Sequence, residues 1–373
     1  MQAGCGPREL VRENRLLNSA AQYLYQKRIR HTAPVGEPLF YGSPEDETNS
    51  YRVAFLCDEM TWADFSPLCR AQFLHPAVWR EQLERFRPDF FFCESCWSGV
   101  PPFEGCWRGQ VYRNRRLLFE NRRVLLEILA YCRQQGIPTV FWNKEDPAGS
   151  LDARYDFIDT ALRFDYIFTT AEECIETYRR RGHQQVALLP FGVNPALFYP
   201  DVSLQRPGTA LFAGSWYADQ PERCKALTEL LEYALAQGWQ LDIYDRHSGS
   251  KERRFRFPER FAPYLRPAVP FARMPELARR YEWAINVNTV TTSQTMFSRR
   301  VLQMLASGTK VLSNPSPAME RFPGVRPLLS GQGYAILRVE GEPTQIVAHC
   351  SNMVRFRMVT GELPGVKRQC VTA

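Results

Sequence analysis

The sequence predicts an α/β fold made of two Rossmann-like domains, each with a parallel sheet, that face a cleft. The chain has 373 residues, more than one compact domain usually holds, so two domains of roughly 150–200 residues are expected. Short apolar runs alternate with amphipathic segments that end at glycine. The apolar runs are continuous, which is typical of parallel strands that have helices on both faces of the sheet.

The first 50 residues are expected to form an extension outside both domains. Residues 8–30 place leucine and alanine at helical spacing, which predicts one amphipathic helix, and a polar linker follows to residue 50. The first domain is expected to span residues 51–200. Its predicted strands are 52–57, 88–93, 137–142, 165–169 and 186–190, and its predicted helices are 76–87, 115–135, 152–163 and 171–181.

The second domain is expected to span residues 201–343, after a crossing at 191–207 that is rich in proline and glycine. Its predicted strands are 209–213, 241–244, 283–287 and 310–313, and its predicted helices are 221–237, 274–281 and 298–307. Residues 344–373 are expected to form a terminal helix, at 344–360, and a tail. In open α/β sheets, ligands bind at the carboxyl ends of the strands, so the functional residues are expected at those ends.

Composition and charge limit the classes of function that are expected. The chain has 47 Lys and Arg against 40 Asp and Glu, a net charge of +7, and 41 of the basic residues are arginine. That excess reflects either codon bias or binding of phosphate, whose oxygens the planar guanidinium matches. No apolar run approaches the length of a membrane span and no secretory signal opens the chain, so a cytoplasmic protein is expected.

Several kinds of site have no support in the sequence. The 11 cysteines are scattered, and the CxxC at Cys93 and Cys96 has no second pair, so no metal is expected. The five histidines lie outside triad and HExxH contexts. No P-loop and no GxGxxG motif occurs, and no cofactor is expected.

The second domain contains a candidate phosphate site. Gly214 follows an apolar strand and opens a loop in which backbone N–H groups of Gly214 and Ser215 can approach a phosphate; an ordinary turn is the alternative. Arg299 and Arg300 fall in the first turn of a predicted helix, where the helix dipole disfavours cations unless an anion joins them. Arg246 ends another strand and either reaches the same anion or pairs with a carboxylate at the surface.

A basic stretch, residues 246–280, contains ten Lys and Arg against three Glu and so accounts for the whole net charge. It is a candidate docking surface for an acidic polymer or a nucleic acid. A solvated basic loop is the alternative.

In the first domain, polar clusters follow three predicted strands: Asp58-Glu59, Glu94-Ser95 with Trp97, and Asn143 to Asp146. Because the carboxyl ends of parallel strands lie at one edge of a sheet, these side chains are expected to converge there. A carboxylate in that position can act as a base toward a hydroxyl group or orient a sugar. A purely structural role is the alternative for each one.

A series of short motifs runs in order along residues 51–320: Asp58-Glu59-Met-Thr-Trp62, Pro88-Asp89, Glu94-Ser95-Cys-Trp97-Ser-Gly99, Trp107, Phe141-Trp-Asn-Lys-Glu145-Asp-Pro147, Phe164-Asp165, Leu189-Pro190-Phe191, Asn194-Pro195, Phe212-Ala-Gly214-Ser-Trp216, Tyr244-Asp245-Arg246, Asn286-Val-Asn288, Met296-Phe297 and Arg299-Arg300-Val-Leu-Gln303. In these motifs the chain resembles the CgeB-like, or spore-maturation-protein-like, glycosyltransferases, which are close to the family-4 enzymes of GT-B fold. The 1–50 extension lies outside the resemblance.

The resemblance implies a GT-B enzyme that binds a nucleotide-diphosphate sugar mainly through its second domain and an acceptor mainly through its first. It implies transfer with retention of anomeric configuration and without a metal. Arg246, Arg299 and Arg300 would neutralise the leaving diphosphate. The related pattern has Glu where this chain has Gln303, so the amide would have to bind the donor ribose in place of a carboxylate.

We therefore expect a glycosyltransferase that moves a sugar from a UDP-linked donor to an acceptor hydroxyl group. The residues expected to bind the donor are Gly214, Ser215, Trp216, Arg246, Asn288, Ser293, Arg299, Arg300 and Gln303. Those expected to bind the acceptor are Asp58, Glu59, Glu94, Ser95, Trp97 and Asn143, and the catalytic group is expected among Glu94, Glu145, Asp146 and Arg300. The alternatives are a nucleotide-sugar epimerase of the same fold and a non-catalytic protein that binds nucleotide sugar or nucleic acid. Polysaccharide, protein and modified DNA all remain open as acceptors.

Overall fold

The computed structural model describes residues 51–148, 154–322, 324–329 and 335–363. The helix predicted within 1–50 and the tail at 364–373 lie outside the described residues. The chain divides into two compact units: Met1–Thr170, Cys174–Leu189 and Met358–Ala373 form the first, and Ala171–Glu173 and Pro190–Arg357 the second. The predicted limit at residue 200 places 190–200 with the first domain, whereas these residues belong to the second unit.

The first unit is built on a six-stranded sheet of order β2-β1-β3-β4-β5-β6, in which every pair is parallel. The strands are β1 (Arg52–Leu56), β2 (Arg70–Phe73), β3 (Phe90–Glu94), β4 (Thr139–Asn143), β5 (Tyr166–Thr169) and β6 (Val186–Leu188). The helices are α3 (Glu59–Phe65), α4 (Trp79–Phe86), α5 (Arg123–Gln135), α6 (Phe157–Ala161) and α7 (Ile175–Arg180), with short 3-10 turns at Ser66–Leu68 and Glu172–Cys174.

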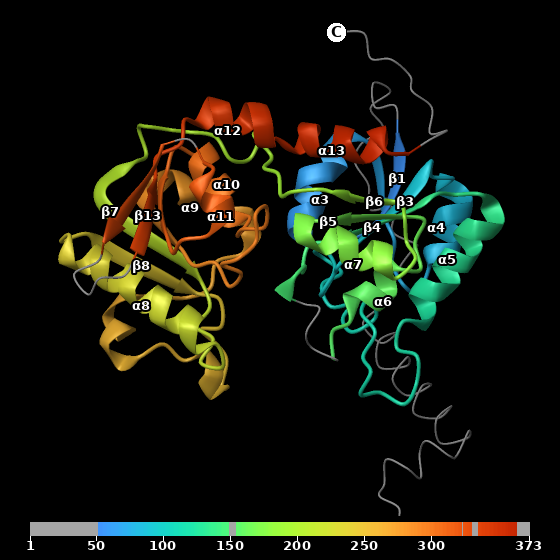
Figure 1. The fold of residues 1–373 in the computed structure, drawn as a ribbon, viewed down its shortest axis with the longest axis horizontal. Helices are drawn as coiled ribbons and strands as arrows, with labels where there is room; N and C mark the ends of the chain where they lie inside the picture. Colours follow the sequence, from blue (N-terminus) through green and yellow to red (C-terminus); the bar gives the residue numbers. More distant parts are fainter. Residues whose placement is uncertain (1–50, 149–153, 323, 330–334, 364–373) are drawn as a thin grey trace, which may run out of the picture. The chain divides into compact units, whose positions relative to one another are not determined.

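Consecutive phenylalanines in β3 explain why both faces of this sheet need cover. Phe92 contacts Phe65 of α3 on one face, and Phe91 contacts Phe164, which follows α6, on the other. The strand order reverses direction between β1 and β3, and right-handed crossovers then place α3 on the face opposite to α4 and α5 (Figure 1). Such a reversal is the point at which open α/β sheets bind ligands.

The second unit has a seven-stranded sheet of order β12-β13-β11-β10-β7-β8-β9. The strands are β7 (Arg206–Gly214), β8 (Gln240–Asp245), β9 (Leu265–Arg266), β10 (Tyr281–Asn286), β11 (Lys310–Ser313), β12 (Val325–Leu329) and β13 (Ala335–Val339). Strands β12 and β13 are antiparallel additions at one edge, and the other strands pair in parallel. The crossovers reverse direction between β7 and β10.

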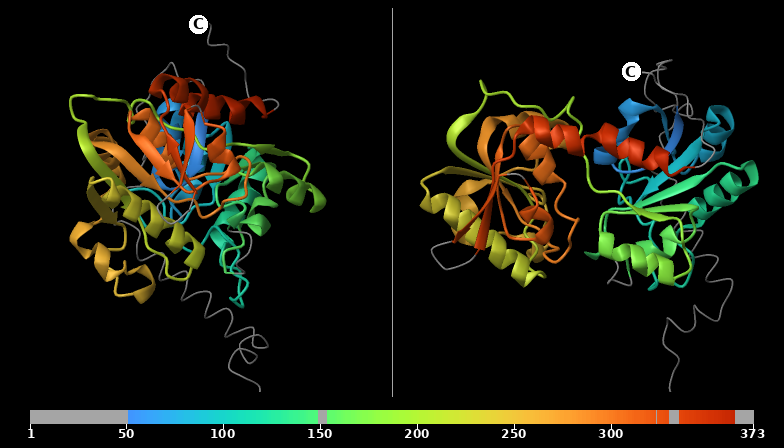
Figure 2. Two further views of the ribbon diagram at one scale, coloured as in Figure 1. Left: turned by 60° about the vertical axis from the view of Figure 1, so that its left-hand side comes forward. Right: turned by 45° about the horizontal axis from the view of Figure 1, so that its top comes forward.

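Helices cover this second sheet on both faces. They are α8 (Pro221–Ala236), α9 (Met274–Arg280), α10 (Arg300–Ala306), α11 (Pro317–Glu320) and α12 (Pro343–Cys350), with 3-10 turns at Arg253–Phe255, Glu259–Tyr264 and Phe271–Arg273. The last helix, α13 (Asn352–Gly361), begins in the second unit and ends in the first. Helix α8 lies on one face of the sheet, and α9 and α10 lie on the other (Figure 1, Figure 2). Between α8 and the sheet, Phe212, Leu227, Leu230, Ile243 and Ile285 are at most 1% exposed. The prediction of two α/β domains with parallel-dominated sheets is confirmed.

Two helices differ from the predictions for physical reasons. The helix predicted at 115–135 begins at Arg123, because the Asn121 side chain donates to the carbonyls of Gly109 and Tyr112 and holds the preceding residues in turns. The helix predicted at 344–360 is two helices, since Ser351 between them adopts an extended conformation and forms a bridge with Val193. Strands β2, β9, β12 and β13 and helices α3 and α11 were not predicted.

Candidate functional site

The second unit brings three arginines to the carboxyl end of β7. Gly214 is the last residue of that strand, and a Cβ atom built on it would lie 3.3 Å from Nη2 of Arg300, the first residue of α10. Arg246, which follows β8, donates its backbone N–H to the Gly214 carbonyl at 3.0 Å. Arg223, in the first turn of α8, donates Nη1 to the Ser215 carbonyl at 2.9 Å. The strand-end loop and the two expected arginines therefore meet, and Arg223 joins them.

The positive charges of these arginines repel one another. Burial, reinforced by the positive charges of Arg223 and Arg246, lowers the pKa of Arg300 to about 10. Burial also lowers the pKa of Arg223. Within the described ranges, no Asp or Glu forms an ion pair with Arg223, Arg246 or Arg300. The Asp245 carboxylate, the alternative partner of Arg246, instead accepts the backbone N–H of His247 at 2.9 Å.

Arg223 and Arg300 are half-buried and Arg246 is exposed, and three such cations without a carboxylate among the described residues are an incomplete electrostatic arrangement. A dianionic or trianionic group placed beside Gly214 would restore the lost stabilisation of each guanidinium through charge-assisted hydrogen bonds. The absence of a side chain at Gly214 lets the Arg300 guanidinium lie directly beside the end of β7. A Cβ there would also lie 2.7 Å from Cζ of Phe212, so this position requires glycine.

The sequence analysis missed Arg223, although the signal was present. Arg223 follows Pro221 and Glu222 in the first helical turn, the same unfavourable position for a cation that singled out Arg299 and Arg300. Only the fold shows that this turn of α8 lies against the loop after β7. The guanidinium of Arg223 also stacks 4.8 Å above the Tyr217 ring of that loop.

Four other residues expected to bind the donor are buried in the second unit. Arg299 is 6% exposed and stacks over the Phe191 ring at 4.8 Å, and Gln303 is 5% exposed within α10. Ser215 is buried, and Trp216 packs against Phe257 with ring centroids 5.5 Å apart, so Trp216 is part of the core of the second unit.

Asn288 and Ser293 organise the loop between β10 and α10. The Asn288 side chain accepts from Ser298 N at 3.1 Å and donates to Ser313 Oγ at 3.2 Å. Ser293 is fully buried, and its Oγ accepts the backbone N–H groups of Thr295 and Met296. Both side chains therefore fix the path of the loop that delivers Arg300 to the arginine cluster.

In the first unit, the expected polar residues converge at the carboxyl ends of β1, β3 and β4, as predicted. The Asp58 carboxylate accepts four hydrogen bonds from the loop after β3: from the backbone N–H groups of Trp97, Ser98 and Gly99 at 2.8–2.9 Å, and from Cys96 Sγ at 3.1 Å. Burial by itself would raise the pKa of Asp58, but Lys144 and these donors outweigh it and lower the pKa to about 2.

Glu94 forms a buried ion pair with Lys144. Its carboxylate lies 2.9 Å from Lys144 Nζ, accepts the backbone N–H of Asp58 at 2.6 Å and accepts the Thr61 hydroxyl. The Glu94 side chain is fully buried. Ser95 is buried beside it, and its Oγ accepts the backbone N–H of Lys144 at 3.0 Å. These contacts identify Glu94 and Ser95 as residues that position the strand ends.

Asp146 and Asn143 take part in a buried hydrogen-bond network. The Asp146 carboxylate is fully buried and accepts hydrogen bonds from Asn143 Nδ2, Thr169 Oγ1 and Tyr178 OH at 2.8–2.9 Å. The Asn143 amide also donates to the Tyr178 hydroxyl at 2.8 Å. This network joins the end of β4 to β5 and α7.

Two carboxylates at this edge remain accessible. Glu145 is half-buried, and its Oε1 accepts the indole N–H of Trp97 at 3.0 Å. Burial raises the pKa of Glu145, and Lys144 and the Trp97 bond oppose that effect. Glu59 is half-buried at the start of α3, and burial together with the charge of Glu104 raises its pKa. Of the three carboxylates expected to be catalytic, Glu145 is therefore the one that solvent reaches.

The basic stretch 246–280 is partly neutralised. Several of its arginines pair with carboxylates: Arg254 with Asp219 and Glu252, Arg260 with Glu232, Arg266 with Asp242, and Arg273 and Arg280 with Glu276. The predicted surface for a polyanion thus contains fewer free charges than the sequence count indicates.

Cys93, Cys96 and Cys106 are buried free thiols, and burial raises the pKa of each. In the part of the chain that the structure describes, no group of three His, Cys, Asp or Glu is arranged to hold a metal ion. None of the helices in that part is long and apolar enough to cross a membrane.

No family model matches the chain, and no curated protein matches it. Among solved structures, it is similar to sucrose-phosphate synthase from Thermosynechococcus elongatus (14% identity, 72% of each chain covered, TM-score 0.42). It is similar to HepE of Anabaena in complex with UDP-glucose (11% identity, 85% of this chain and 92% of that one, TM-score 0.41). It is also similar to an alpha-glucosyltransferase in complex with UDP-glucose and DNA containing an abasic site (9% identity, 84% and 94%, TM-score 0.48).

Proposed function

We propose that the chain is a GT-B glycosyltransferase of the CgeB-like kind that moves a sugar from a nucleotide-diphosphate donor, UDP-linked, to an acceptor hydroxyl group. The observation that supports this most is the cluster of Arg223, Arg246 and Arg300 around Gly214, without an ion-pair partner in the described ranges. Transfer of a sugar from a nucleotide diphosphate develops negative charge on the leaving diphosphate, and preorganised guanidinium groups stabilise that charge.

The contacts support a role for each residue within this proposal. Arg300 and Arg223 bind the diphosphate, Arg246 closes the site from the solvent side, and the backbone at Gly214 and Ser215 approaches the phosphate oxygens. Gln303, on α10, binds the donor ribose, and Arg299, which directly precedes α10, lies beside it. Asn288 and Ser293 position the loop that leads to Arg300. In the first unit, Glu145 accepts a hydrogen bond from the acceptor hydroxyl, while Asp58, Glu94, Ser95, Asn143 and Asp146 hold the strand ends that place it.

Calorimetric titration of the full chain with UDP, UMP and uridine tests the donor site. Each charge-assisted hydrogen bond to phosphate contributes about 1.5–3 kcal/mol, so Arg300→Ala and Arg223→Ala should each weaken UDP binding by roughly 10-fold to 100-fold and leave the weak binding of uridine unchanged. Arg206→Ala is the matched control, because Arg206 is an exposed arginine at the opposite end of β7. UDP affinity that is equal in Arg300→Ala and Arg206→Ala would overturn the diphosphate assignment.

Product analysis separates the alternatives. Incubation with UDP-glucose alone and in the presence of oligosaccharides, followed by NMR of the product, should show a new glycosidic bond with the anomeric configuration of the donor. Activity should persist in EDTA. A product in which the donor sugar is epimerised and no acceptor is consumed would identify an epimerase instead. UDP binding without turnover would identify a binding protein.

A further inference from the structure

Four aromatic rings pack together beside Glu145 in the first unit. The Trp97 ring lies 5.1–5.4 Å from the rings of Tyr112, Tyr155 and Phe157, and the Tyr112 ring lies 5.1 Å from Tyr155 and 5.4 Å from Phe157. Phe157 is buried and forms the base of the cluster, whereas Trp97, Tyr112 and Tyr155 are half-buried and reach solvent. These rings come from three separate segments, so their meeting is a property of the fold.

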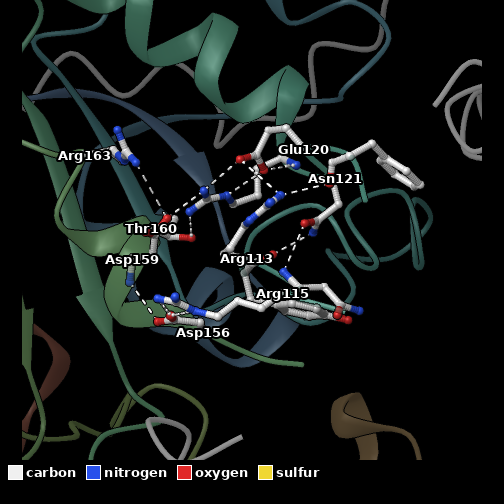
Figure 3. A network of polar contacts seen from close by, with 12 residues as sticks. Arg113, Arg115, Glu120, Asn121, Asp156, Asp159, Thr160 and Arg163 are labelled. Atoms are coloured by element: carbon white, nitrogen blue, oxygen red, sulfur yellow. Dashed lines mark hydrogen bonds and ion pairs between the residues drawn. The ribbon is translucent and has the colours of Figure 1, made fainter. Parts of the chain in front are cut away.

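A polar network holds the cluster in place. The backbones of Arg113 and Asp156 form an isolated antiparallel bridge, which sets Tyr112 beside Tyr155 and Phe157. Around this bridge, Arg115 pairs with Asp156 at 2.6 Å and Arg113 pairs with Glu120 at 3.4 Å (Figure 3). On the other side, the Asp58 carboxylate fixes the backbone of Trp97. The ring positions are therefore set before any ligand arrives, which reduces the entropy lost on binding.

Glu145 adds one polar group to this apolar surface. Its Oε1 is occupied by the Trp97 indole, and its Oε2 has no hydrogen-bond partner among the described residues. Glu145 is half-buried. A hydroxyl group that donates to Oε2 would thus lie within reach of the same Trp97 side chain that orients the carboxylate.

We propose that Trp97, Tyr112, Tyr155 and Glu145 form an acceptor subsite for an uncharged carbohydrate ring, a proposal that rests on the glycosyltransferase function proposed above. A sugar ring has an apolar face of C–H groups, which packs on the electron-rich face of an aromatic ring, and an edge of hydroxyl groups. Binding sites of this kind combine aromatic walls with a few placed polar groups. The cluster supplies the wall, and Glu145 supplies the acceptor for one hydroxyl.

The charges around the cluster favour a neutral sugar over a nucleic acid. Glu145 lies near Asp58 and Glu94, which both form an ion pair with Lys144. Arg154 lies over the Tyr155 ring at 5.1 Å, and Arg115 is already paired with Asp156. Phosphates would meet the carboxylates of this edge. The rings also cross at 51–87°, so no two of them form a parallel slot for a base.

The test measures binding of neutral trisaccharides to the full chain in the presence of UDP. Maltotriose, cellotriose, N-acetylchitotriose and a single-stranded DNA oligonucleotide are the probes, and saturation-transfer NMR and calorimetry are the readouts. At least one trisaccharide should bind, and Tyr155→Ala should weaken it by about tenfold, the typical loss of one stacking ring. UDP affinity should not change. Tyr166→Ala is the matched control, because Tyr166 is a half-buried tyrosine at the opposite end of the same sheet.

Tyr112→Leu provides a second variant if Tyr155→Ala fails to fold, since leucine retains bulk against Phe157. The proposal is overturned if no trisaccharide binds, if the DNA binds in their place, or if trisaccharide binding is the same in both variants and the control. Failure of the glycosyltransferase function is seen separately. In that case wild-type protein fails to bind UDP or to turn over UDP-glucose, whatever the trisaccharides do.

Discussion

The guanidinium of Arg300 lies against the face of Gly214 that has no side chain. A Cβ at residue 214 would lie 3.3 Å from Nη2 of Arg300 and 2.7 Å from Cζ of Phe212, whose ring also lies 5.6 Å beneath the same guanidinium. The positions of Phe212 and Arg300 therefore depend on the absence of a methyl group at residue 214. The position of the arginine and the identity of the glycine are a single structural feature.

Gly214→Ala should displace Arg300 and weaken UDP binding by roughly tenfold, because one charge-assisted hydrogen bond to the diphosphate would be lengthened. The stability should fall by about 1–3 kcal/mol, the usual effect of overpacking a core position. Calorimetry with UDP and denaturation in urea measure the two effects. Gly249→Ala is the control, since a Cβ there meets nothing within 4 Å. Equal UDP affinity in both variants would contradict the contact described above.

Arg300→Met should separate stability from binding. The folded-state pKa of Arg300, about 10, lies below the ordinary value of a guanidinium, so the folded chain holds this charge less favourably than the unfolded chain does at every pH below about 10. A neutral side chain of similar length removes that cost. The free energy of unfolding at pH 7 should stay the same or rise by roughly 1–3 kcal/mol, while UDP affinity should fall by about 10-fold to 100-fold.

Arg206→Met is the control for this pair of measurements, because Arg206 is exposed at the amino end of β7. It should change neither quantity by more than about 0.5 kcal/mol. If Arg300→Met lost stability and kept UDP affinity, Arg300 would be a structural residue and not a ligand of the diphosphate.

The two domains were predictable from sequence because their strands are buried on both faces. Phe90-Phe91-Phe92 is a continuous apolar run, since alternate side chains enter two different layers of helices. The antiparallel strands β12 and β13 and the short edge strand β2 were missed for the opposite reason. A strand such as Arg70–Phe73 mixes charged and apolar residues and has no periodicity of its own, so its pairing with β1 depends on the assembled sheet.

The candidate site was predictable only where local position constrains chemistry. Arginines in a first helical turn pointed to Arg300, and the ends of parallel strands pointed to Asp58, Glu94 and Asn143. The sequence does not show which carboxylates pair with Lys144. It therefore does not predict which carboxylates stay accessible to solvent. Lys144 pairs with Asp58 and Glu94. Of the three carboxylates expected to be catalytic, Glu94 and Asp146 are buried and Glu145 is half-buried.

Asp58→Asn should make the stability of the chain less dependent on pH. The pKa of Asp58 is lowered from 3.8 to about 2 in the folded state, so its carboxylate stabilises the fold above pH 4 and loses that effect as the pH falls toward 2. The substitution should cost about 2 kcal/mol at pH 7 and progressively less below pH 4. Urea denaturation between pH 2 and pH 7 measures the difference. Glu81→Gln, which removes an exposed pair with Arg85, should cost less than about 1 kcal/mol and serves as the control.

Trp97→Phe should move the acid limb of the transfer reaction to higher pH. The indole N–H of Trp97 donates to Glu145 Oε1 at 3.0 Å, and this bond favours the ionised carboxylate, as does Lys144, while burial, Glu94 and Asp58 disfavour it. Phenylalanine keeps a ring but not the donor, so the pKa of Glu145 should rise by roughly one unit or less. The role proposed for Glu145, to accept a hydrogen bond from the acceptor hydroxyl, requires the ionised carboxylate, so the rate at a given acidic pH should fall. NMR titration of the Glu145 carboxyl carbon measures the same shift without an acceptor. Trp62→Phe, in α3 of the same unit, should leave both the titration and the pH profile unchanged, and an unshifted profile in Trp97→Phe would show that Glu145 is not the group that titrates.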